Sequence, residues 1–146
     1  MSMTFRALAA TVLASAALLG GCAGMGVSKP TKERVVVQVS DGNPGTWQLA
    51  LNVVDNLRRG YAKRNVDAEI AIDAFGPGIQ MLKDDAVVAS RVRDAMKDGT
   101  QVVACENSMG RFKLTREVML EKISYVEAGV IDIIEKQHQG WSVIRP

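Results

Sequence analysis

The sequence predicts an α/β protein with a parallel sheet that helices cover on both faces. The first observation is an alternation, along residues 34–146, of short apolar segments and longer segments with helical spacing. The second is that four of the five residues 35–39 are valine, as in a strand buried on both faces. Because a helix follows each strand except the last, successive strands are expected to run parallel.

The first half of this domain begins with a strand, a helix and a second strand. Residues 34–40 form the first strand, and a cluster of turn-forming residues ends it. Apolar residues then recur at helical spacing from Thr46 to about Arg59, and Gly60 is expected to end this helix. Residues 67–75 largely alternate between apolar and acidic side chains, which indicates the second strand.

The third strand, residues 101–105, ends on Cys105, which is the main candidate for a functional residue. A helix that begins at Asp84 or Asp85 precedes this strand, and a loop through Lys113 follows it. Ligands of parallel α/β proteins bind in the crevice outside the carboxyl ends of the strands. Cys105 therefore lies where a reactive side chain is expected.

The last part of the chain is predicted to hold two short strands and two helices. Thr115 is expected to cap a short helix, and residues 123–126 form a short fourth strand. A helix over residues 129–137 and a strand over residues 141–144 complete the domain. The apolar residues of the last helix that are expected to face inward are Val130, Ile133 and Ile134.

Residues 1–21 are predicted to be a secretory signal peptide, because one positive charge precedes 13 small and apolar residues. That segment is short for a membrane span, which needs about 20 residues, although an uncleaved anchor is an alternative. The order Leu19-Gly20-Gly21-Cys22 resembles the lipobox of bacterial lipoproteins, which implies cleavage before Cys22 and its acylation. By the same resemblance, Ala23 after the cysteine implies the outer rather than the inner membrane, with the domain on the periplasmic side. Residues 22–33 then form a lipidated cysteine and a flexible tether; an ordinary signal peptide is the other alternative.

Composition argues against several classes of function. The net charge of +2 and the aromatic content of 5% give no indication of nucleic-acid binding. Cys22 and Cys105 do not make a disulfide framework, and lipidation of Cys22 would leave Cys105 as the only thiol. One cysteine and the single histidine, His138, are too few ligands for a metal site, so no metal or other cofactor is expected. His138 is expected to be a solvated residue near a helix C-terminus.

Three stretches in the second half of the chain look familiar when they are taken together: Val102 to Met109, Lys113 to Thr115, and Gly129 to Pro146. In their order and spacing they resemble the DsrE/DsrF-like family of small α/β proteins, and the likeness extends over about residues 34–146. The resemblance implies a three-layer α/β/α sandwich with a five-stranded, mainly parallel sheet. It also implies assembly into homo-trimers or homo-hexamers.

In the better understood relatives, a cysteine in this region accepts sulfur as a persulfide and hands it to a partner protein. The resemblance implies this role for Cys105, with Asn107 and Ser108 inside the same motif. Arg111 or Lys113 on the following loop could lower the pKa of the thiol and so favour the reactive thiolate. The export signal is a departure from the family, because relay proteins of this kind work in the cytoplasm.

The sequence leaves two functions open. In the first, the chain is a lipid-anchored envelope protein that handles sulfur, or carries out thiol redox chemistry, through Cys105. Its partners would be sulfur donor and acceptor proteins, and it would be a sulfur carrier rather than a hydrolase with turnover. In the second, the chain is a non-catalytic oligomeric module that binds a small ligand or a peptide, and Cys105 is a structural core residue.

Overall fold

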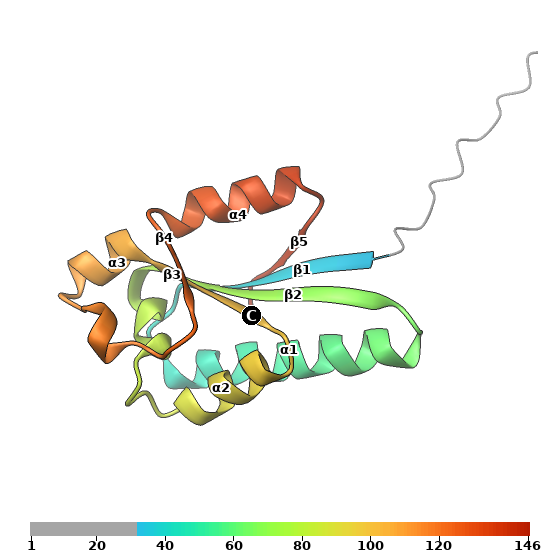
Figure 1. Cartoon of the computed structure of the whole chain (residues 1–146), viewed down its shortest axis with the longest axis horizontal. Coiled ribbons are helices and arrows are strands. Elements are labelled where there is room, and N and C mark those ends of the chain that lie inside the picture. Colours follow the sequence, from blue (N-terminus) through green and yellow to red (C-terminus); the bar gives the residue numbers. More distant parts are fainter. Residues whose placement is uncertain (1–31) are drawn as a thin grey trace, which may run out of the picture.

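Five parallel strands form the centre of the domain in the computed structural model of the chain, which describes residues 32–146 (Figure 1). The strands are β1 (Lys32–Val39), β2 (Asp67–Ala74), β3 (Gln101–Cys105), β4 (Ser124–Val126) and β5 (Ser142–Ile144). Their order across the sheet is β4-β3-β2-β1-β5, and every neighbouring pair is parallel. The predicted five-stranded sheet is confirmed. The predicted signal peptide, the lipidation of Cys22 and the tether up to residue 31 lie outside the described residues.

Helices cover both faces of the sheet, so the three-layer α/β/α sandwich is also confirmed (Figure 1). The helices on one face are α1 (Pro44–Lys63), α2 (Ala89–Lys97) and the 3₁₀ helix η1 (Gly76–Leu82). The other face carries α4 (Gly129–His138), and two short helices, α3 (Glu106–Arg111) and η2 (Arg116–Val118), lie beyond the carboxyl end of β3. Within residues 32–146, no helix is both long enough and apolar enough to cross a membrane.

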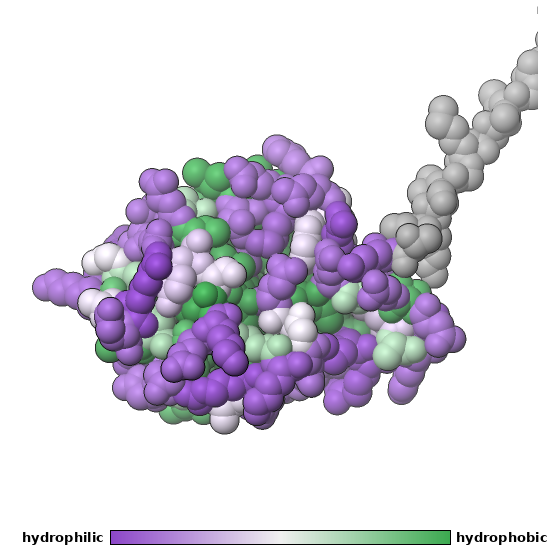
Figure 2. Space-filling model, in the orientation of Figure 1, coloured by the Kyte–Doolittle hydropathy of each residue, from purple (hydrophilic) through white to green (hydrophobic). Residues whose placement is uncertain are grey.

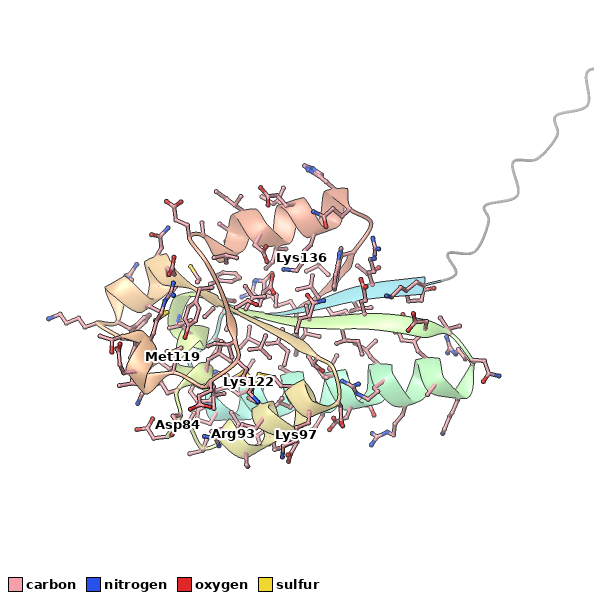
Figure 3. All side chains as sticks on the ribbon, viewed as in Figure 1. Asp84, Arg93, Lys97, Met119, Lys122 and Lys136 are labelled. Atoms are coloured by element: carbon pink, nitrogen blue, oxygen red, sulfur yellow. The ribbon has the colours of Figure 1, made fainter. Side chains whose placement is uncertain are left out.

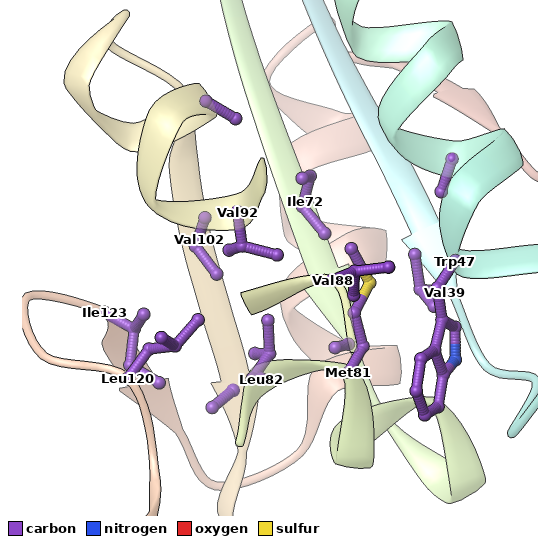
Figure 4. Close-up of a cluster of buried hydrophobic side chains, with 14 of the residues drawn as sticks. Val39, Trp47, Ile72, Met81, Leu82, Val88, Val92, Val102, Leu120 and Ile123 are labelled. Atoms are coloured by element: carbon purple, nitrogen blue, oxygen red, sulfur yellow. The ribbon is translucent and has the colours of Figure 1, made fainter. Parts of the chain in front are cut away.

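The face of the sheet under α1 and α2 holds the main hydrophobic core (Figure 4). It contains 22 buried apolar residues, to which α1 contributes Trp47, Ala50, Leu51 and Val54 at helical spacing. Full burial of one large apolar side chain contributes about 1.5–3 kcal/mol to stability. This face of the sheet therefore supplies most of the apolar stabilisation of the domain.

The face under α4 has a much smaller core. Its buried apolar cluster consists of Val36, Ala71, Ile133 and Trp141. Beside this cluster lies an ion pair between Asp73 of β2, which is fully buried, and Lys136 of α4, which is 9% exposed. The layer that holds α4 is thus part apolar and part ionic.

The outer side of α4 is apolar and exposed. Val130, Ile131 and Ile134 are 52%, 55% and 50% exposed. Figure 2 shows apolar side chains along the edge of the molecule where α4 lies. The prediction that Val130 and Ile134 face inward is therefore wrong, whereas Ile133 is buried as predicted.

Three other local predictions are wrong, each for a physical reason. Gly60 does not end α1, because a helical glycine costs only about 1 kcal/mol relative to alanine, which the packing of this long helix outweighs. The second helix begins at Ala89 rather than at an aspartate, since Lys83 first forms an isolated bridge with Met119 that keeps the chain extended. The predicted loop after Cys105 is the helix α3.

Candidate functional site

Cys105 ends β3, and the chain turns from it directly into α3. Its sulfur lies 3.6 Å from the carbonyl oxygen of Glu127, to which the neutral thiol can donate a hydrogen bond. Cys105 is only 5% exposed. It thus lies at the carboxyl edge of the parallel sheet, where ligands bind in folds of this kind, with its thiol largely covered by the start of α4.

A pocket of about 310 Å³ opens over Cys105. It is lined by Phe75, Gly76, Cys105, Asn107, Ser108, Arg111, Ala128, Gly129 and Val130. Four of these residues, namely Cys105, Asn107, Ser108 and Arg111, are the site residues that the sequence suggests. The structure brings them together around one cavity, between the end of β2, the start of α3 and the start of α4.

Hydrogen-bond donors control the acidity of the Cys105 thiol. Burial is the largest single influence, and it raises the pKa of the thiol. The Ser108 hydroxyl and the backbone N–H groups of Gly129, Ser108 and Asn107 act in the opposite direction, because they stabilise the thiolate. Together they prevail, and the pKa of Cys105 is lowered from its ordinary value.

The Ser108 hydroxyl is itself held in place. Its oxygen accepts a hydrogen bond of 2.7 Å from the backbone N–H of Gly76, and Ser108 is 8% exposed. That bond leaves the hydroxyl proton free to point at the sulfur. Gly76 has φ +52°, a left-handed conformation that glycine adopts without strain, so the turn after β2 aims its N–H group at Ser108.

Gly129 brings the N-terminus of α4 directly onto Cys105. A Cβ atom at position 129 would lie 3.2 Å from the Cβ of Phe75 and 3.3 Å from the Cβ of Cys105. Any larger residue would therefore crowd the pocket. As the first residue of α4, Gly129 also has no carbonyl partner for its N–H group inside the helix, so this donor is available to the thiolate.

Charged side chains contribute less than the sequence suggests. Arg111 lines the pocket, but neither it nor Lys113 is among the groups that set the pKa of Cys105. Glu106, whose carboxylate would oppose a thiolate, forms an ion pair with Arg116 instead. Hydrogen-bond donors, rather than the predicted cations, account for the lowered pKa.

The remaining sequence candidates lie elsewhere. His138 is exposed in the last turn of α4 and does not line the Cys105 pocket. Among residues 32–146, no three His, Cys, Asp or Glu side chains are grouped so that they could hold a metal ion. Trp141 is 9% exposed and belongs to the small core under α4.

A larger cavity, of about 750 Å³, lies at the amino ends of β3 and β4, away from Cys105. Arg93 and Lys97 line it, and Figure 3 shows them on the opposite side of the sheet from Lys136. Each forms an ion pair, Arg93 with Asp84 and Lys97 with Asp94. Because both cations are paired with an aspartate and neither cysteine nor histidine lines this cavity, Cys105 remains the better candidate despite its smaller pocket.

Sequence reasoning missed the part of the site that other elements contribute. Phe75 and Gly76 follow β2, whereas Ala128 and Gly129 begin α4. One signal was available: the carboxyl ends of neighbouring parallel strands meet at one edge, so the residues after β2 must approach Cys105. No comparable signal indicates that α4 starts over the thiol.

This geometry defines a small α/β protein with a nearly buried thiol at the carboxyl edge of its sheet, where hydrogen-bond donors lower the pKa of that thiol. The family model for the DsrE/DsrF-like family matches residues 49–146. The chain belongs to this family. No curated protein matches the chain.

Two solved structures have the same fold. The protein of unknown function MTH1491 from Methanobacterium thermoautotrophicum is 25% identical, with a TM-score of 0.70 over 78% of this chain and 99% of that one. The conserved protein of unknown function BT1422 from Bacteroides thetaiotaomicron is 17% identical, with a TM-score of 0.62 over 78% of this chain and 95% of that one. The second likeness concerns the fold alone.

Proposed function

We propose that the chain is a sulfur carrier in which Cys105 accepts a sulfur atom as a persulfide and passes it to a partner protein. The observation that carries this proposal is the set of hydrogen-bond donors around the thiol, which lower its pKa although it is nearly buried. Membership of the DsrE/DsrF-like family supports a role related to sulfur relay. A carrier needs a reachable thiolate and no general base, and none lines the pocket.

The transfer step is a thiolate exchange. The Cys105 thiolate attacks the outer sulfur of a donor persulfide, the bond between the two donor sulfurs breaks, and the donor thiolate leaves with the electron pair. The outer sulfur keeps its proton, so Cys105 becomes a persulfide without net oxidation or reduction. An acceptor thiolate repeats the attack on the same sulfur and releases the Cys105 thiolate. The donors from Ser108 and Gly129 stabilise the negative sulfur at both ends of the cycle.

Mass spectrometry of the full chain after incubation with cysteine persulfide tests this function. The peptide of residues 98–111, which trypsin releases, is expected to gain one sulfur atom on Cys105, and dithiothreitol is expected to remove it. Cys22 lies in a different tryptic peptide, so a mass change at Cys22 is read separately from one at Cys105. A Cys105→Ser variant is expected to gain nothing. An unmodified Cys105 in the folded wild type would rule the carrier function out.

One observation favours the alternative function, a binding module in which Cys105 is structural. The thiol is 5% exposed and can donate a hydrogen bond to the carbonyl of Glu127, as a packed core cysteine does. Under this alternative, the Cys105→Ala variant keeps the binding of any ligand or partner, and cysteine persulfide leaves the wild type unchanged. The two functions thus differ in the outcome of the same persulfide experiment.

The proposal includes the cellular setting. The lipobox-like order that ends at Cys22 supports a lipid anchor that holds the domain on the periplasmic side of the outer membrane. The exposed apolar residues Val130, Ile131 and Ile134 support assembly into a homo-trimer or homo-hexamer. The intact mass of protein purified from membranes tests the lipid on Cys22, and native mass spectrometry tests the assembly. An unprocessed N-terminus would contradict the lipid anchor. A monomer would contradict the assembly into a trimer or hexamer.

A further inference from the structure

The ion pair between Asp73 and Lys136 has no part in the transfer step, yet it is the most deeply buried charged group of the described chain. Asp73 lies on β2, an interior strand of the sheet, and is fully buried. The ammonium nitrogen of Lys136 lies 3.2 Å and 3.4 Å from its two carboxylate oxygens. Asp132, one turn earlier on α4, binds the same nitrogen. Figure 3 shows Lys136 between α4 and the sheet.

This ion pair is one of few contacts that hold α4 on the sheet. The buried residues of α4 are Gly129, Ile133 and Lys136, whose spacing places them on one face of the helix. Gly129 has no side chain, and Ile133 packs in a small apolar cluster. Apolar contacts allow a helix to slide or rock, whereas two opposite charges in a dry layer must meet. The charged pair therefore sets the position of the C-terminal half of α4.

The other end of the same helix places a backbone N–H donor, that of Gly129, beside the candidate thiol, and this donor lowers the pKa of Cys105. Gly129 and Lys136 are seven residues apart, which corresponds to about 10 Å along a rigid helix. Rocking of α4 about the buried Ile133 would move the Gly129 N–H group away from Cys105. Neither Asp73 nor Lys136 is among the groups that shift the pKa of Cys105 directly, so any influence of the pair on the thiol has to pass through the helix.

We propose that the Asp73–Lys136 ion pair is a positioning device for Cys105: it seats α4 on the sheet and thereby keeps the Gly129 N–H group beside the sulfur. This inference rests on the proposed function, since it concerns how the reactive thiolate of that function is maintained. Asp73 and Lys136 are positioning residues and touch no reacting atom. Asp132 is a secondary partner on the same helix: it binds the Lys136 ammonium and also shares a side-chain hydrogen bond with Asp73.

The test is the pH profile of Cys105 alkylation by iodoacetamide, read on the peptide of residues 98–111 from the full chain. Lys136→Met removes the cation, and Asp73→Asn removes the anion at nearly constant shape. In both variants the midpoint of the profile is expected to move to higher pH. Near neutral pH the alkylation rate is expected to fall about fivefold, the scale of the net contribution of one typical hydrogen bond.

Two matched variants separate positioning from a general loss of stability. Val54→Ala opens a cavity in the fully buried part of α1, on the opposite face of the sheet, and is expected to leave the midpoint unchanged. Lys136→Arg keeps a cation of similar reach and is expected to restore the wild-type midpoint. If circular dichroism shows that Lys136→Met does not fold, the alkylation profile of Asp73→Asn alone tests the proposal. The proposal is overturned if Asp73→Asn shifts the midpoint no more than Val54→Ala does.

This readout requires no sulfur donor, so it fails independently of the proposed function. A shifted midpoint together with no persulfide on Cys105 would remove the carrier function and leave the positioning role in place. Persulfide formation on Cys105 with unshifted midpoints in both variants would support the carrier function and remove the positioning role.

Discussion

The two faces of the sheet are built differently, and the difference separates stability from chemistry. Under α1 and α2, 22 buried apolar residues form the main core. Under α4, four buried apolar residues share the layer with the Asp73–Lys136 ion pair. Cys105 belongs to the second face, where Gly129 of α4 lies against it. The large core can therefore hold the fold together while the smaller layer adjusts the thiol.

Leu51→Ala should produce the largest loss of stability on the α1 face. Leu51 is 2% exposed in the main core, and such truncations cost about 2–5 kcal/mol because a cavity remains. Urea unfolding measures the loss. The alkylation rate of Cys105 in the folded variant is expected to equal that of the wild type. A changed rate would show that the core under α1 also influences the thiol.

The pH dependence of stability should carry a contribution from Asp73. Burial, as the largest cause, and the neighbouring Asp132 raise the pKa of Asp73 from 3.8 to about 7, against the effect of Lys136. The folded protein thus holds this proton more tightly than the unfolded chain does, and the Asp73–Lys136 pair is fully charged only above about pH 7. The resulting stabilisation is complete below about pH 4 and is lost as the pH rises to about 7.

Urea unfolding of wild type and Asp73→Asn across this pH range isolates that contribution, because the surface carboxylates titrate equally in both. The difference in unfolding free energy is expected to change by a few kcal/mol, since one pKa unit corresponds to about 1.4 kcal/mol. A pH-independent difference would mean that Asp73 is ionised throughout.

Gly129→Ala should affect the reactivity of Cys105 as well as stability. The added Cβ would lie 3.2–3.3 Å from Phe75 and Cys105, so α4 has to move outward, at a cost of about 1–3 kcal/mol. Alkylation of Cys105 near neutral pH is expected to slow several-fold. Gly110→Ala in α3 is the matched control, because a Cβ there meets nothing within 4 Å. Equal alkylation rates in the two variants would contradict the role given to the start of α4.

Lys97→Met should have the smallest effect. Lys97 and Asp94 form an ion pair of 2.9 Å on α2, but their side chains are 75% and 67% exposed. Exposed pairs contribute little because water screens them. The urea midpoint is expected to stay within experimental error of the wild type, whereas Lys136→Met, which breaks the buried pair, is expected to lower it clearly.

The fold could be predicted from the sequence because the patterns that indicate it lie within single segments of the chain. The valine run of β1 and the alternation of strands with amphipathic helices predict a parallel sheet, and the apolar run that ends at Cys105 places the thiol at its edge. The helix α3 was missed because Asn107, Ser108 and Gly110 are typical of loops. Burial of Met109 and Ser108 stabilises that helix, and this is a tertiary effect.

The orientation of α4 could not be predicted for a related reason. Apolar periodicity predicts that Val130, Ile133 and Ile134 face the sheet, but the buried residues are Gly129, Ile133 and Lys136. A close backbone approach at one end and a charged partner on β2 at the other rotate the helix. Neither contact leaves a hydrophobic signal in the sequence, so the part of the site that α4 supplies was hidden.

The two edges of the sheet have a consequence for how copies of this chain meet. Among residues 32–146, the outermost strands β4 and β5 have only three residues each, whereas β1 and β2 have eight. Strands this short offer few unpaired backbone groups of their own to a neighbouring chain, which disfavours growth of the sheet through β4 or β5. A contact between copies at β4 or β5 would then form through side chains rather than by strand pairing.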